Sequence, residues 1–172
     1  MFFVKELERV FYVHASYLGS GLHNELTKRI HTEIEGMIED NYFIVCILED
    51  DKFSEGRTIP GGGHIEYTAY MKALCWQPYK REVVDGVVLN LVESGFFCEI
   101  GALVVFVSQE HMPKDMFFET QGAGPQWTNN KDMTIERSSS VRVRLLGVKA
   151  TMNRLTGIAT INEDYLGVLA NS

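Results

Sequence analysis

The 172-residue sequence predicts an α+β domain followed by an all-β domain. The first half holds one helix-like apolar stripe among strand-like segments, whereas the second half shows strand patterns without helical periodicity. Pro78 separates the two halves, so we place the domains at 1–78 and 79–172. The second half has five strand segments and a glycine-rich first hairpin, and this is the strand count of an OB barrel.

The first half begins with a predicted strand over residues 2–13, which are rich in Phe, Val and Tyr. A helix is expected next, with Ser16 or Ser20 as its N-cap. Its apolar stripe repeats every four residues: Leu22, Leu26, Ile30 and Ile34. Residues 42–48 form a continuous apolar run typical of a central strand, and 64–76 alternate as a further strand. Between them lies a turn-rich loop over 56–63.

Five strands are predicted in the second half: Glu82 to Leu91, Gly95 to Gly101, Leu103 to Ser108, Ser140 to Lys149, and Leu155 to Ile161. A long insertion, 109–138, separates the third strand from the fourth. Structureless loops of this length are uncommon in compact domains. We therefore expect a short helix near Pro113 to Phe118 within the insertion, followed by an irregular tip over 121–125.

The composition is that of an ordinary globular protein with a net charge of −7. No apolar run is long enough to span a bilayer, and the N-terminus reaches charge too early for a secretory signal, so no membrane association is expected. The cysteines Cys46, Cys75 and Cys98 lie in apolar surroundings and are expected to be buried thiols within strands. A strongly acidic protein does not hold nucleic acid by its overall charge, so any such site must be local.

The sequence shows no catalytic constellation. The run of three glycines at 61–63 opens no predicted helix, so it does not predict a phosphate-binding loop. The five histidines share no metal-ligand spacing with one another or with the cysteines. Ser20, His31 and Asp40 do not make a convincing catalytic triad. We therefore expect neither enzyme activity nor a bound metal or cofactor.

A candidate RNA-binding site lies in the second half. Aromatic faces that stack on bases and cations that track the backbone are the usual means of holding single-stranded RNA. Phe97 and Phe106 are the candidate stacking residues, although both also suit the barrel core. The candidate cations occur in residues 139–162, which carry no acid and which span two strands expected to be adjacent: Arg142, Arg144, Lys149 and Arg154.

Several motifs along the whole chain resemble the seventh-subunit family of RNA polymerase II. They are the opening Met1-Phe2-Phe3, Pro60-Gly61-Gly62-Gly63, Trp76-Gln77-Pro78-Tyr79, the run from Glu82 to Val88, Gly95-Phe96-Phe97, Phe106-Val107-Ser108 and the tail Glu163-Asp164-Tyr165-Leu166-Gly167. The chain departs from the family at residue 81, which is Arg where the family usually has Gly.

This resemblance implies a truncated ribonucleoprotein-like N-terminal domain and an OB-fold of the ribosomal-protein S-one type. It implies a non-catalytic stalk subunit in the nucleus that pairs with the smaller helical stalk subunit, docks on the core polymerase and contacts emerging single-stranded RNA. The loop that we expect to dock is glycine-rich and exposed, and an apolar pair at its tip suits a pocket on a larger body: Arg57, Ile59, Pro60, Gly61, Gly62 and Gly63. The alternatives are a free-standing OB-fold RNA-binding factor of translation or RNA decay and, as a third hypothesis, an enzyme.

Overall fold

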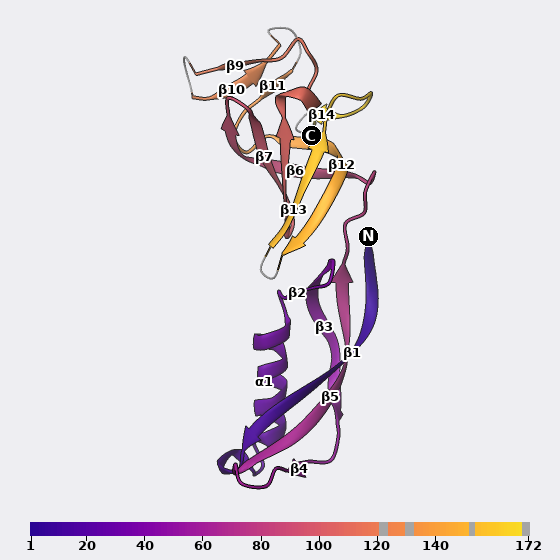
Figure 1. Cartoon of the computed structure of the whole chain (residues 1–172), viewed down its shortest axis with the longest axis vertical. Helices are drawn as coiled ribbons and strands as arrows, with labels where there is room; N and C mark the ends of the chain where they lie inside the picture. The colour runs from indigo at the N-terminus through magenta and orange to yellow at the C-terminus, as the bar shows by residue number, and fades with distance from the viewer. Residues whose placement is uncertain (121–123, 130–132, 152–153, 170–172) are drawn as a thin grey trace. The chain divides into compact units, whose positions relative to one another are not determined.

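The computed structural model describes residues 1–120, 124–129, 133–151 and 154–169 (Figure 1). The chain forms two compact units, Met1–Gln77 and Pro78–Ser172. In the first unit a helix packs on an antiparallel sheet, and in the second a closed β-barrel carries an inserted small sheet.

Unit 1 contains a five-stranded sheet and one α-helix. Its elements are β1 (Phe2–His14), the short 3-10 helix η1 (Ala15–Tyr17), α1 (Leu22–Ile34), β2 (Ile38–Glu39), β3 (Tyr42–Phe53), β4 (Arg57–Thr58) and β5 (His64–Trp76). The strand order is β1-β5-β3-β2, and β4 pairs with β5. All pairings are antiparallel, and β1 runs in unbroken register with β5 from Phe2–Trp76 to His14–His64.

The core of unit 1 lies between α1 and one face of the sheet, and α1 contacts β3 (Figure 1). The predicted stripe is confirmed, because Leu26, Ile30 and Ile34 are buried. The predicted cap is wrong: α1 begins after Gly21, and no side chain caps it. The expected alternation in β5 is confirmed by its buried core residues: Ala69, Met71, Ala73 and Cys75.

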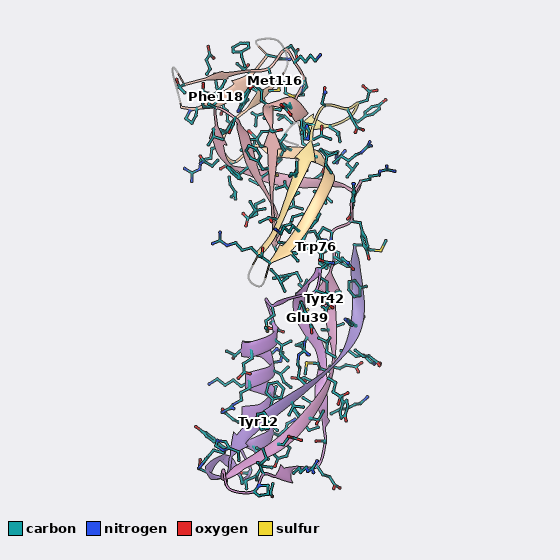
Figure 2. All side chains as sticks on the ribbon, in the orientation of Figure 1. Tyr12, Glu39, Tyr42, Trp76, Met116 and Phe118 are labelled. Carbon is teal, nitrogen blue, oxygen red and sulfur yellow. The ribbon has the colours of Figure 1, made fainter. Side chains whose placement is uncertain are left out.

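The opposite face of this sheet is not covered by the helix. Side chains of a strand alternate between the two faces, so the residues between the buried ones point away from α1. On this open face Val4, Val10, Tyr12 and Tyr70 are all exposed. Figure 2 shows Tyr12 near the end of β1. On the same face the exposed Glu6 and Glu8 lie between Val4 and Val10, so the open face is a mixed apolar and acidic surface.

Unit 2 is a closed five-stranded barrel with an insertion. Its elements are β6 (Val83–Val92), β7 (Gly95–Ile100), β8 (Leu103–Ser108), η2 (Gln109–His111), β9 (Phe117–Glu119), β10 (Gln126–Thr128), β11 (Thr134–Ile135), β12 (Ser140–Thr151), β13 (Arg154–Thr160) and β14 (Gly167–Val168). The barrel order is β13-β8-β7-β6-β12, and β12 pairs with β13 to close it. Only β8 and β13 pair in parallel among the described strands. The arrangement is consistent with the predicted OB-fold.

The barrel interior is filled by the inward-facing residues of each strand. β7 and β8 alternate strictly between buried and exposed or half-buried positions from Phe96 to Ser108, apart from the turn. Phe96, Val105, Val143 and Leu155 are fully buried. Because the core takes every second residue, the residues between them stand on the outer surface of the barrel.

The insertion folds as a three-stranded sheet in the order β11-β10-β9. The helix expected near Pro113 to Phe118 is therefore wrong. That segment holds one turn, in which the Met116 N–H donates to the Pro113 carbonyl at 3.1 Å. Phe117 then begins β9. Pairing of β9 with β10 satisfies backbone groups that a helix would otherwise satisfy. Residues 121–123 of the expected tip lie outside the described residues.

Candidate nucleic-acid interface

An aromatic pair stands on the outer face of the barrel. Phe97 on β7 and Phe106 on β8 are opposite partners in the antiparallel register. Their ring centroids are 4.8 Å apart with an interplanar angle of 44°. Phe97 is 38% exposed and Phe106 is half-buried, while the neighbouring Phe96 fills the core. The structure thus places neither candidate stacking residue inside the barrel.

Gly95 allows the Phe106 ring to lie against the β6–β7 hairpin. Its φ of 154° is in a region that side chains disfavour. A Cβ atom built there would overlap the Val107 carbonyl oxygen and would lie 2.9 Å from Cζ of Phe106. Glycine at this position is therefore part of what positions the aromatic pair.

The aromatic pair belongs to a longer row across the barrel surface. Phe106 is the parallel partner of Ile158 on β13, which is 51% exposed, and Phe97 is the partner of Asn90 on β6. Cross-strand partners lie on the same face of a sheet. Ile158 was missed by the sequence analysis, although the burial of Leu155 and Ala159 leaves it as an outward position of its strand.

Two of the candidate cations lie on the hairpin next to this row. Lys149 is paired in register with Thr156, which precedes Ile158 by two residues on the same face of β13. Arg154 is paired with Thr151 at the start of β13. Both cations are exposed, and within the described part of the chain neither forms a salt bridge. Of the four candidate cations, they are the two without a carboxylate partner among the described residues.

The other two candidate cations are already paired with carboxylates. Arg142 donates two hydrogen bonds to Asp85, at 2.6 and 2.8 Å, and the guanidinium lowers the pKa of that carboxyl below its usual value. Arg144 pairs with Glu163. Both arginines lie on β12, which borders β6 and β13 but neither β7 nor β8. The adjacency of β12 and β13 is confirmed, but the six candidate residues are not brought together at one place.

The loop implicated in docking forms the hairpin between β4 and β5. Arg57 pairs with Glu66, and the backbone N–H of Ile59 donates to the His64 carbonyl at 3.1 Å. Ile59 is half-buried, whereas the remaining loop residues are exposed: Arg57, Pro60, Gly61, Gly62 and Gly63. Gly61 and Gly63 have positive φ angles of 88° and 62°.

A second exposed loop lies beside this hairpin. The Ala15 N–H donates to the Gly63 carbonyl at 2.9 Å, which ties the β1–α1 connection to the hairpin. In that connection Tyr17 is 50% exposed and Leu18 is 48% exposed. Neither residue could be selected from the sequence, because no local pattern shows that this connection is bonded to the glycine loop.

The described residues contain no group of three or more His, Cys, Asp and Glu side chains arranged to hold a metal ion. All three cysteines are free, and burial raises the pKa of the Cys98 thiol to about 12, so the thiolate nucleophile is suppressed. Cys75 is buried and Cys46 is half-buried. Among the described residues no helix combines the length and the apolar character that a membrane crossing requires.

Several known proteins match the chain over nearly its full length. No protein-family model matches it. The chain is 36% identical over 171 residues to "DNA-directed RNA polymerase II subunit rpb7" of Schizosaccharomyces pombe, covering 98% of this chain and 99% of that protein. It is 33% identical to the protein of the same name from Dictyostelium discoideum and 31% identical to "DNA-directed RNA polymerase II subunit RPB7" of Saccharomyces cerevisiae, each over 98% of this chain.

Proposed function

Because the chain belongs to the family of RNA polymerase II subunit Rpb7, we propose that it is the larger stalk subunit of a nuclear RNA polymerase II. In this proposal it is non-catalytic, it forms a heterodimer with the smaller helical stalk subunit, and it contacts emerging RNA during transcription. The nearly full-length match to polymerase subunits favours this role over that of a free-standing RNA-binding factor.

The observation that carries the RNA-binding part of the proposal is the Phe97–Phe106 pair on the second and third strands of the barrel. OB-folds bind oligonucleotides over this face. Base stacking on aromatic rings accepts any base, so binding is expected to tolerate many sequences. With Lys149 and Arg154 as the candidate cations on a protein of net charge −7, we expect weak binding that salt abolishes.

The proposed heterodimer is supported by the open sheet face of unit 1. In this proposal unit 1 is the truncated ribonucleoprotein-like domain, and its helix covers only one side of the sheet. The other side exposes Val4, Val10, Tyr12 and Tyr70, a surface that a stable partner is expected to cover. Replacing Val10 by Asp is expected to weaken the heterodimer in a pull-down with the smaller stalk subunit.

Docking on the core polymerase is proposed for the exposed end of unit 1. Tyr17 and Leu18 add two exposed apolar side chains in the connection that the Ala15–Gly63 hydrogen bond ties to the glycine loop. Exposed apolar side chains on a loop are suited to a pocket on a larger body. Leu18→Asp should weaken binding of the assembled heterodimer to the core polymerase and leave the heterodimer itself intact. Loss of the heterodimer instead would show that this end has a structural role.

The RNA-binding proposal is tested by replacing Phe97 with Ala. Phe117 on β9 supplies a matched control, because it is 39% exposed and Phe97 is 38% exposed. Phe97→Ala should weaken binding of single-stranded RNA roughly tenfold, since a base stacked on an aromatic ring contributes ~1–3 kcal/mol. Phe117→Ala should leave the affinity unchanged. Equal affinities for the wild type and for a folded Phe97→Ala variant would contradict this location of the site.

A further inference from the structure

The insertion holds the β6–β7 hairpin through three carbonyl groups. The indole Nε1–H of Trp127 donates to the Val92 carbonyl at 3.2 Å and to the Gly95 carbonyl at 3.3 Å. The backbone N–H of Gln109, at the start of the insertion, donates to the Ser94 carbonyl at 3.0 Å. Residues of the insertion thus donate hydrogen bonds to the carbonyl groups of three of the four turn residues 92–95.

Trp127 is anchored firmly on the side of the insertion. It lies on the central strand β10, between Phe118 of β9 and Ile135 of β11, and it is 1% exposed. Its ring centroid is 5.5 Å from that of Phe118, and Figure 2 shows Phe118 within the insertion. A buried indole N–H needs an acceptor, and here it has two carbonyls of the same hairpin. The small sheet therefore holds the Trp127 indole N–H in place as a hydrogen-bond donor to the β6–β7 hairpin.

The hairpin that Trp127 holds is also the base of the aromatic pair. Gly95 opens β7 two residues before Phe97, and the Phe106 ring lies over it. The loop between the first two strands of an OB-fold flanks its oligonucleotide site. A shift of Gly95 would move the surface on which Phe106 rests and the strand that carries Phe97.

We propose that Trp127 is a positioning residue of the RNA-binding face, acting through the Gly95 and Val92 carbonyls on Phe106 and Phe97. The inference rests on the proposed RNA-binding function. It assigns the insertion a specific task, which is to fix the β6–β7 hairpin in the form that presents both rings. The hydrogen of the indole nitrogen, rather than the bulk of the ring, is the group that carries this task.

The test compares two substitutions within the insertion of the full-length chain. Trp127→Phe keeps an aromatic ring and removes the N–H donor, whereas Phe118→Leu removes the neighbouring ring and leaves the donor in place. The probe is a labelled single-stranded oligouridylate of about 12 nucleotides, within the range of site sizes for one OB-fold. Affinity is measured over a series of salt concentrations, together with the thermal stability and the aromatic NMR spectrum of each variant.

Trp127→Phe is expected to lower the affinity about three- to tenfold, the range that one hydrogen bond commonly contributes. The salt dependence should stay unchanged, because no phosphate contact is lost. The ring resonances of Phe97 and Phe106 should shift or broaden in Trp127→Phe. In Phe118→Leu the affinity should fall less than in Trp127→Phe, because the indole donor stays in place.

Two results would overturn the inference while the proposed function stands. One is an unchanged affinity in Trp127→Phe when Phe97→Ala still weakens binding. The other is an equal loss in Trp127→Phe and Phe118→Leu that follows their loss of thermal stability, since Trp127 would then act only as packing. If Phe97→Ala leaves binding unchanged, the proposed binding face itself fails, and the positioning role fails with it.

Discussion

The four basic residues of β12 and β13 should differ in their contribution to RNA binding. Arg142 and Arg144 are engaged by carboxylates, whereas Lys149 and Arg154 form no salt bridge with a described residue. An anion that reaches either arginine must compete with its carboxylate. We therefore expect Lys149→Gln/Arg154→Gln to weaken RNA binding and Arg142→Gln/Arg144→Gln to leave it nearly unchanged.

The expected magnitude follows from the number of phosphate contacts. Each contact with a single strand contributes about 0.7 to the slope of log affinity against log salt, so two lost contacts make the slope shallower by about 1.4. Between about 50 and 200 mM salt, the wild type should lose roughly sevenfold more affinity than Lys149→Gln/Arg154→Gln. Fluorescence anisotropy of a labelled single-stranded RNA over a salt series measures both slopes.

The second double variant is a matched control, because each double variant removes two positive charges from the barrel. Any effect of net charge alone is therefore the same in the two. A reduced slope in Arg142→Gln/Arg144→Gln, with an unchanged slope in Lys149→Gln/Arg154→Gln, would show that RNA displaces the carboxylates and crosses β12. That result would refute the placement of the site over β7, β8 and β13.

Three further predictions concern stability. Arg81 has a φ of 71°, so Arg81→Gly should raise the free energy of unfolding by about 0.5–1 kcal/mol in urea titrations. The hydrogen bond to Glu35 raises the pKa of His31 above its ordinary 6.5, with a further contribution from Asp50. The stabilisation of the folded state by protonated His31 is therefore fully present below pH 6.5 and is lost as the pH rises through the folded-state pKa. The difference in unfolding free energy between the wild type and His31→Gln should shrink above pH 6.5. Gly95→Ala should lower the free energy of unfolding by about 2–4 kcal/mol, and the thermal midpoint with it, because the Cβ of the alanine would overlap the backbone of β8.

Local sequence patterns predicted most elements of the fold. The apolar stripe of α1 and the alternation in β5 each report on burial within a single element, and both agree with the structure. The five barrel strands were placed for the same reason. The strand that begins at Phe117 was predicted wrongly as part of a helix, because Phe117 joins a strand only by pairing with Thr128 on β10. Pairing between short, separate segments leaves no periodic signal.

The candidate site shows where sequence reasoning fails for a physical reason. Residues 139–162 contain four cations and no acid, which suggested a free basic patch. Arg144 is neutralised by Glu163, one residue beyond that window, and Arg142 by Asp85, which is 57 positions away. The second pair arises from the register of β12 with β6, where Arg142 lies opposite Asp85. Ion pairs of this kind depend on the tertiary structure and cannot be counted along the chain.

The central claim is that RNA binds the outer face of β7, β8 and β13 in this polymerase subunit. NMR titration of the full-length chain with single-stranded RNA tests it most directly, because the shifts map the contact surface residue by residue. We expect salt-sensitive shifts at Phe97, Phe106 and Ile158. Shifts confined to Arg142, Arg144 and the neighbouring tail, or no shift on the barrel at saturating RNA, would contradict it.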